Sequence, residues 1–165
     1  MSNFNNMLGI PQGMLGSPIN CVVSASSGSF TTASSSAVDV TNLSCQIASS
    51  GDYPLHIRLI PDGSTSSSQI LCGSSGGTGT APECHVYILR NGTVICDFYQ
   101  LYEPVGTGNP SVCVPVSSVS TLDFPTKGMQ TYKVQVKCNA GGGTPEVRMY
   151  NAKLVVYEDR SLIYK

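Results

Sequence analysis

Two histidines and seven cysteines are the residues of this 165-residue chain that could form a catalytic or metal-binding site. Cys84 directly precedes His85, a combination that could supply a nucleophile and its base. Neighbouring residues of a strand point to opposite faces, however, and a nucleophile and its base must lie within hydrogen-bond reach. His56 alternates with apolar residues in Leu55-His-Ile-Arg-Leu59, so we interpret it as a side chain on a polar face that it shares with Arg58. Neither histidine is predicted to be catalytic.

The acidic residues and the glycine-rich segment lack the spacing of a known site. The acids are scattered and form no DxDxDG calcium loop. Gly73–Gly79 resembles a phosphate-binding loop, but neither Lys-Ser/Thr nor a predicted helix follows it. Asn42-Leu-Ser44 and Asn91-Gly-Thr93 match the glycosylation sequon, which has no meaning without a secretory signal. We therefore expect no catalytic residue, no metal site and no cofactor.

The cysteines are predicted to be mostly reduced thiols of the core. They are Cys21, Cys45, Cys72, Cys84, Cys96, Cys113 and Cys138. None belongs to a CxxC pair and no histidine has a metal-ligand spacing to them, which argues against a zinc site. Most lie in apolar runs, where a free cysteine behaves as a small hydrophobic residue. Cys72 and Cys84 flank segment 73–82 and form the one candidate disulfide, which would close that loop in an oxidising medium.

Apolar and polar residues alternate along the chain, which is the pattern of strands with one buried face. Candidate strands span 21–32, 37–49, 53–60, 69–72, 85–90, 93–102, 112–124, 130–139 and 145–158. In the last of these the apolar parity changes near Met149 and Tyr150, which a β-bulge would explain. Asn91-Gly92 predicts a type I′ turn that joins two strands into a hairpin.

These elements predict an all-β chain that folds as an antiparallel, jelly-roll-like β-sandwich of eight or nine strands. Residues 21–165 would form this single domain, and residues 1–20 would form an extended N-terminal arm. Apolar residues in the arm are separated by Asn, Gly and Pro, which favours an arm that lies across its own domain or a neighbouring subunit over a regular helix. The predicted partner-binding residues are Phe4, Met7, Leu8, Ile10 and Leu15.

Composition narrows the possible partners. Only 12% of the residues are charged and the net charge is −1, so there is no basic surface to attract nucleic acid or an anionic membrane. No apolar run approaches the roughly 20 residues that span a bilayer. The first ten residues lack the basic and apolar regions of a secretory signal, so we expect the chain to fold in a cytoplasm.

The second half of the chain resembles the closing strands of small virion proteins of tailed bacteriophages. The segments that carry the resemblance are Asp123-Phe-Pro125, Thr131-Tyr-Lys-Val-Gln-Val136 and Asn151-Ala-Lys-Leu-Val-Val-Tyr-Glu158. The hairpin Leu89-Arg-Asn-Gly-Thr93 is similar to one that often precedes them, so the resemblance covers residues 85–158. It implies a jelly-roll-like sandwich, often trimeric, of the kind found in capsid decoration proteins and in fibre or receptor-binding heads. The absence of a repetitive shaft favours a compact protein attached to a shell.

We therefore expect a non-enzymatic structural protein of the virion, assembled in the host cytoplasm. The leading interpretation is a homotrimeric capsid decoration or cement protein that binds between major capsid proteins and lays its arm on neighbouring subunits. The alternative is a tail or fibre module for adhesion to a host receptor or glycan, with loops 61–68 and 73–82 as recognition tips. A small hydrolase would need convergent acids or a Cys–His pair, which the sequence does not display.

Overall fold

The computed structural model describes residues 20–66, 68–75, 83–101, 112–115, 118–139 and 144–159. Ten β-strands form from these residues: β1 (Cys21–Thr32), β2 (Val38–Ser49), β3 (Leu55–Pro61), β4 (Gln69–Ser75), β5 (Glu83–Arg90), β6 (Thr93–Leu101), β7 (Val112–Pro115), β8 (Val119–Asp123), β9 (Gly128–Asn139) and β10 (Thr144–Glu158). Within these residues no helix is long and apolar enough to cross a lipid bilayer. The predicted all-β class is confirmed.

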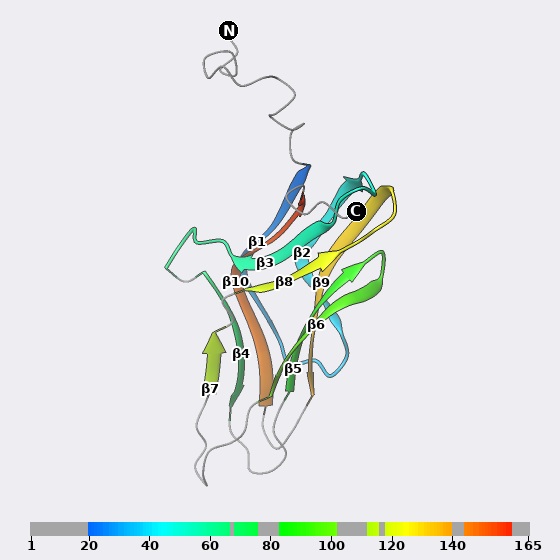
Figure 1. Cartoon of the computed structure of the whole chain (residues 1–165). Helices are drawn as coiled ribbons and strands as arrows, with labels where there is room; N and C mark the ends of the chain where they lie inside the picture. The colour runs from blue at the N-terminus through cyan, green and yellow to red at the C-terminus, as the bar shows by residue number, and fades with distance from the viewer. Residues whose placement is uncertain are drawn as a thin grey trace.

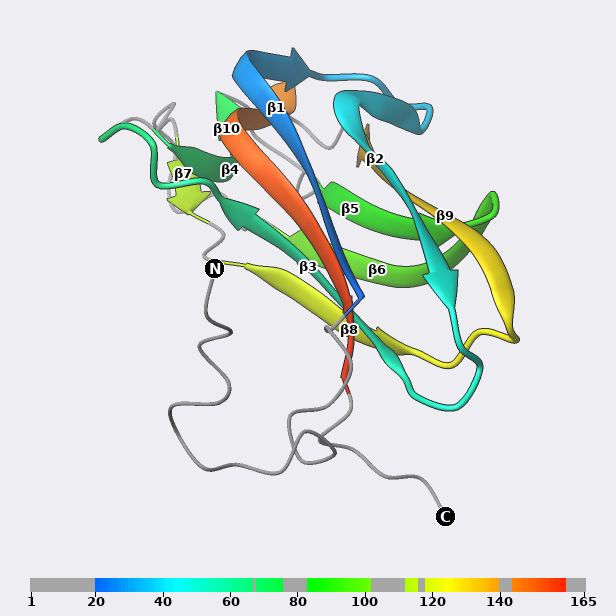
Figure 2. The same cartoon turned by 90° about the horizontal axis from the view of Figure 1, so that it is seen from above.

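The strands form two antiparallel sheets that pack face to face (Figure 1). The four-stranded sheet has the order β2-β9-β5-β6. In the six-stranded sheet, the long strand β10 pairs with β1 along one of its edges. Along its other edge, the first half of β10 pairs with β4, which pairs with β7, and the second half pairs with β3, which pairs with β8. Figure 2, seen from above, shows β1-β10-β3-β8 and β2-β9-β5-β6 as the two layers. This is the strand order of a jelly roll, so the predicted jelly-roll-like sandwich is confirmed.

The number of strands differs from the prediction at one place. The single strand expected over 112–124 is two strands, β7 and β8. β7 pairs with β4 and β8 pairs with β3, so the two extend opposite ends of the six-stranded sheet. The described residues of the sandwich therefore form ten strands, against the eight or nine expected.

Alternation of residue types determines which side of each strand meets the core. β9 illustrates this with a regular alternation of buried and half-buried positions. Its fully buried side chains are Tyr132, Val134, Val136 and Cys138, and those on the outer side are Lys133, Gln135 and Lys137. The inward residues of both sheets join in one apolar core, whose removal from water is the main force that holds the sandwich together.

β10 changes its buried face at Asn151, so the predicted bulge is confirmed. Met149 is buried before this point and Ala152 is buried after it. Asn151 has a φ of 47° and Gly28, on the facing stretch of β1, has a φ of 83°. The backbone N–H of Gly28 donates to Asn151 Oδ1 over 2.8 Å, and the pairing of β1 with β10 shifts here. The bulge lets both halves of the long strand direct apolar side chains inward.

The β5–β6 hairpin turns at Asn91 and Gly92 as predicted, with φ angles of 49° and 87°. Its register shifts by one residue between Ile88 and Leu89. Beyond the shift, the residues of β5 therefore face different partners on β6 than an unbroken hairpin would give them. As a result, His85 on β5 lies opposite Tyr99 on β6.

Gly51, which follows β2, must be a glycine for steric reasons. It has a φ of +79°, and a Cβ added there would lie 2.8 Å from the backbone nitrogen of Lys127. We expect Gly51→Ala to lower the free energy of unfolding by about 2–3 kcal/mol, since a left-handed backbone costs about 1–2 kcal/mol and overpacking at least about 1 kcal/mol. Urea denaturation measures this change.

Gly63→Ala is the matched control for this substitution. Gly63 has a φ of +68°, but a Cβ there would meet no atom within 4 Å. This variant should lose only the backbone contribution of about 1–2 kcal/mol. Equal losses in the two variants would show that the contact with Lys127 is not what restricts position 51.

Candidate functional site

The residues predicted to bind partners, Phe4, Met7, Leu8, Ile10 and Leu15, lie outside the described part of the chain. The description begins at Asn20, at the base of the predicted arm. The carbonyl oxygen of Asn20 accepts a hydrogen bond of 3.0 Å from the backbone N–H of Glu158 in β10. Its side-chain amide donates to the carbonyl oxygen of Ala48 in β2. Asn20 is therefore hydrogen-bonded to both sheets.

Six cysteine side chains are described, and all are free thiols. Cys72, Cys84 and Cys138 are fully buried, as predicted for core cysteines. Cys45 and Cys96 are half-buried, and Cys21 is the exposed exception among the described cysteines because it lies on the outward side of the edge strand β1. Cys72 and Cys84, the candidate disulfide pair, are both free and buried on opposite sheets.

Cys84 and His85 point to opposite sides of β5, as strand geometry predicts. The thiol of Cys84 lies in the core, 4.0 Å from the sulfur of Cys138 on the neighbouring strand. Contact with Cys138 lowers the pKa of Cys84, but contact with Cys72 and burial outweigh it and raise that pKa to about 12. A thiol with this pKa is protonated at neutral pH and is a poor nucleophile. The two side chains do not form a nucleophile–base pair.

The outer face of the four-stranded sheet carries a connected group of aromatic and ionisable side chains around His85. Its Nδ1 lies 2.9 Å from Asp97 Oδ1, and its Nε2 lies 3.8 Å from Glu83 Oε2. The imidazole stacks on Tyr87 with ring centroids 5.5 Å apart and planes at 17°. Tyr99 packs against it at 5.0 Å and 51°. We call these five residues the histidine patch.

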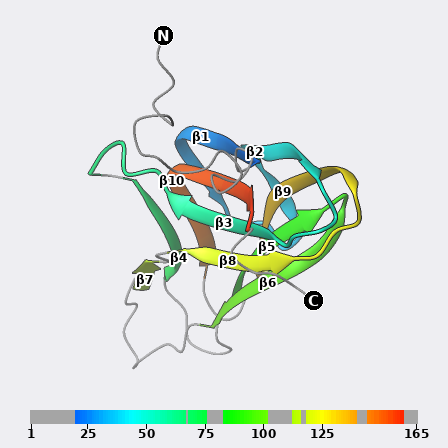
Figure 3. The same cartoon turned by 45° about the horizontal axis from the view of Figure 1, so that its top comes forward.

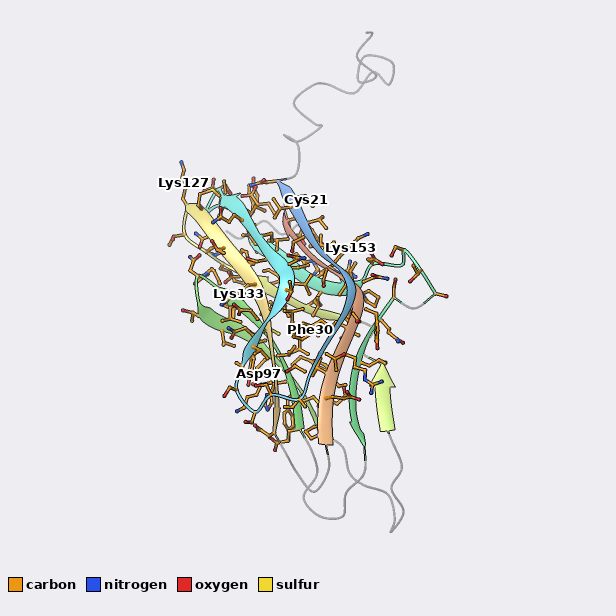
Figure 4. The ribbon with its side chains drawn as sticks, turned by 180° about the vertical axis from the view of Figure 1, so that it is seen from behind. Cys21, Phe30, Asp97, Lys127, Lys133 and Lys153 are labelled. Atoms are coloured by element: carbon orange, nitrogen blue, oxygen red, sulfur yellow. The ribbon has the colours of Figure 1, made fainter. Side chains whose placement is uncertain are left out.

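Strand register places the histidine patch in rows across the sheet. The rows are Lys137–His85–Tyr99, Gln135–Tyr87–Asp97 and Asn139–Glu83. Glu83 accepts hydrogen bonds from Asn139 Nδ2 at 2.6 Å and from the Tyr99 hydroxyl at 3.3 Å. The bond from Asn139 is the largest cause that lowers the pKa of Glu83, so this carboxylate is ionised at neutral pH. Figure 4 shows Asp97 toward one end of this sheet and Lys133 nearer its middle.

The chemistry that the histidine patch offers is recognition by rings and hydrogen-bond acceptors. The hydroxyl of Tyr99 donates to Glu83, and desolvation followed by the charge of Glu83 raises the pKa of Tyr99. That hydroxyl is therefore not activated as a nucleophile. Across the described residues, no group of three or more His, Cys, Asp or Glu side chains is placed to hold a metal ion.

The outer face of the six-stranded sheet is more apolar. Figure 3 shows four of its strands, β1, β10, β3 and β8, side by side. Its two rows are Cys21–Tyr157–His56–Leu122 and Val23–Val155–Arg58–Ser120. Val23 is 54% exposed and Leu122 is 41% exposed. We call Val23, Leu122, Val155 and Tyr157 the apolar face.

His56 lies on this outer surface beside Arg58, as predicted. Its Nδ1 is 2.6 Å from the Tyr157 hydroxyl, and the two rings pack at 5.2 Å. The contact holds Tyr157 in place within the apolar face. The arrangement is that of a surface ring pair rather than of a catalytic histidine.

The loops predicted as recognition tips are described only in part. Residues 76–82 and 67 lie outside the described residues. In the remainder, Asp62 Oδ1 accepts hydrogen bonds from the backbone N–H of Ser64 at 2.7 Å and from the Ser68 hydroxyl at 2.8 Å. The bonds from Ser64 are the largest causes that lower the pKa of Asp62. This carboxylate is thus engaged within its own turn.

The sequence suggests chemistry for His85 only as a partner of Cys84 and does not show its contacts with Tyr87, Asp97 and Glu83. The missing information was the register of the β5–β6 hairpin. Alternation places Glu83, His85 and Tyr87 on one face of their strand and Asp97 and Tyr99 on one face of the next, but it does not show that the two sets meet.

No protein-family model and no curated protein matches the chain. Among solved structures, the chain is similar to dimeric latent PorU from Porphyromonas gingivalis, with 8% sequence identity and a TM-score of 0.38. The match covers 86% of this chain but only 13% of that protein. A likeness at this level identifies neither a family nor a function.

Proposed function

We propose that this chain is a structural virion protein, a capsid decoration or cement protein that attaches to a shell through the apolar face and the arm at residues 1–20. The apolar face is the observation that carries the proposal. Val23 and Leu122 expose about half of their surface to water in rows that cross four paired strands. Burial of such side chains against a partner is favourable by roughly 25 cal/mol per Å².

The apolar face is too small to form a stable interface alone, which supports a role for the arm in attachment. Four strands spaced about 4.8 Å apart are about 14 Å wide between the outermost axes, so two rows cover a few hundred Å² at most. A stable interface buries about 800 Å² on each partner. The predicted arm residues would supply the remaining contact area. Asn20, the last residue of the predicted arm, directly precedes Cys21 in the first row of the apolar face, which supports a contact that continues from this row onto the arm.

The fold supports the same proposal by analogy. Jelly rolls occur in viral capsid domains, although a fold alone does not determine a function. The partner we propose is the major capsid protein, and the assembly is a homotrimer. A closed trimer would also protect strands at the ends of the sheet order, such as β8, from open-ended pairing.

Val23→Asp tests the proposed attachment surface. The substitution places a charge within the proposed contact, so we expect binding to shells that lack this protein to weaken by about tenfold or more, a loss of about 1.4 kcal/mol or more. Co-sedimentation of purified variants with such shells measures the binding. Val94→Asp is the matched control, since Val94 is 48% exposed against 54% for Val23 but lies on the four-stranded sheet.

The control should bind as the unchanged protein does. Equal binding of the two variants would contradict the proposed surface.

A chain that lacks residues 1–19 measures how much the arm contributes to shell binding. If it bound shells fully and protected them from heat, the arm would have no part in attachment.

A further inference from the structure

We propose that the histidine patch binds an uncharged saccharide, with Tyr87 and Tyr99 supplying ring surface and Asp97 and Glu83 accepting hydrogen bonds from sugar hydroxyls. The histidine patch lies on the four-stranded sheet, whereas the apolar face lies on the six-stranded sheet. The inference therefore goes beyond shell attachment and does not depend on it.

The histidine patch is held in place before any ligand arrives. His85 contacts Asp97 at 2.9 Å and packs against the rings of both tyrosines. Glu83 is held by Asn139 at 2.6 Å. Side chains that are already ordered lose little conformational freedom on binding, which favours the recognition of a small ligand.

The histidine patch also retains unused hydrogen-bonding capacity that faces water. Asp97 bonds to His85 through Oδ1, and its Oδ2 has no partner among the described residues. The hydroxyl of Tyr87 likewise makes no hydrogen bond to a described side chain. The side chains of Asp97 and Glu83 are 44% and 34% exposed, so a ligand can reach their carboxylates. Hydroxyl groups of a sugar are donors that suit such acceptors.

Charge and ring surface together select the class of ligand. The two carboxylates repel an anion. A cation is also a poor match, because the cationic residue Lys137 stands directly opposite His85 and Glu83 already accepts hydrogen bonds from Asn139 and Tyr99. Tyr99 exposes 47% of its surface, which provides an apolar surface beside the acceptors. A sugar ring, with apolar C–H faces and many hydroxyls but no charge, satisfies all three conditions.

Titration of the isotope-labelled full chain, followed through its backbone amide signals by NMR, tests the proposal. The probes are lactose, maltotriose, cellotriose and triacetylchitotriose, all uncharged, at up to tens of millimolar. We expect at least one of them to shift amide signals of β5, β6 and β9 around the histidine patch. Tyr99→Ala should weaken that binding by about tenfold or more, and Asp97→Asn should weaken it measurably.

Tyr150→Ala is the matched control, because Tyr150 is a half-buried tyrosine of the six-stranded sheet and should leave binding unchanged. The urea midpoint of each variant shows that it is folded. The proposal is overturned if no probe shifts these signals, or if binding persists in both Tyr99→Ala and Asp97→Asn. It is also overturned if tetramethylammonium binds the histidine patch and the saccharides do not, since the ligand would then be a cation.

Discussion

Asp123→Ala is expected to lower the free energy of unfolding by about 3–5 kcal/mol. Asp123 ends β8 and is only 8% exposed. Its Oδ2 accepts a hydrogen bond of 2.6 Å from the hydroxyl of Tyr132, and its Oδ1 accepts bonds from Arg90 at 2.7 Å and from the backbone N–H of Phe124 at 3.0 Å. One carboxylate therefore joins the six-stranded sheet to β5 and β9 of the other sheet.

The loss is large because the partners of Asp123 remain when the carboxylate is removed. The hydroxyl of Tyr132 is fully buried and would have no replacement partner, and the Arg90 guanidinium would lose its ion pair. An unsatisfied buried donor costs about 1–3 kcal/mol, and a charge more. Tyr132→Phe removes that hydroxyl, so the double variant Asp123→Ala/Tyr132→Phe should lose less than the sum of the single losses.

Urea denaturation measures these changes, with Asp39→Ala as the control. Asp39 contacts Lys133 at 2.9 Å and Gln135 at 2.6 Å, but its side chain is 60% exposed. An exposed pair of this kind contributes about 0–1 kcal/mol. If Asp39→Ala and Asp123→Ala cost the same, the buried network would not join the two sheets as described.

Leu154→Ala is expected to cost about 2–5 kcal/mol, while Val155→Ala at the next position costs less than about 1 kcal/mol. Leu154 is fully buried in the core, whereas Val155 lies on the outer face of β10. Truncation of a buried leucine leaves a cavity, but truncation of a surface valine removes only part of an exposed contact. Chemical denaturation of both variants compares the two positions directly.

This pair also tests the bulge at Asn151. Val147 and Met149 are buried, so an unbroken strand would bury Val155 and expose Leu154. The bulge reverses that parity. A larger loss for Val155→Ala than for Leu154→Ala would contradict the assignment of faces beyond Asn151.

Local patterns were sufficient to predict most of the sandwich. Alternation in 130–139, the Asn91-Gly92 turn and the change of parity in 145–158 each reflect a local steric or burial rule. The division of 112–124 into β7 and β8 was missed. Which neighbour each half pairs with depends on strands distant in the sequence, and alternation carries no information about that choice.

The histidine patch was missed for a similar reason. Counting back from the Asn91-Gly92 turn in an unbroken hairpin would place His85 opposite Phe98, an inward-facing residue of the core. The shift between Ile88 and Leu89 instead places His85 opposite Tyr99. A bulge has no reliable sequence signature here, so the ring contacts that define the histidine patch became visible only with the register of the sheet.

We propose that the chain is a component of a viral shell. The most direct test is mass spectrometry of purified particles after capsids and tails have been separated on a density gradient. We predict that the protein co-migrates with capsids in a constant ratio to the major capsid protein. Its presence only with tails, or its absence from purified particles, would contradict the claim.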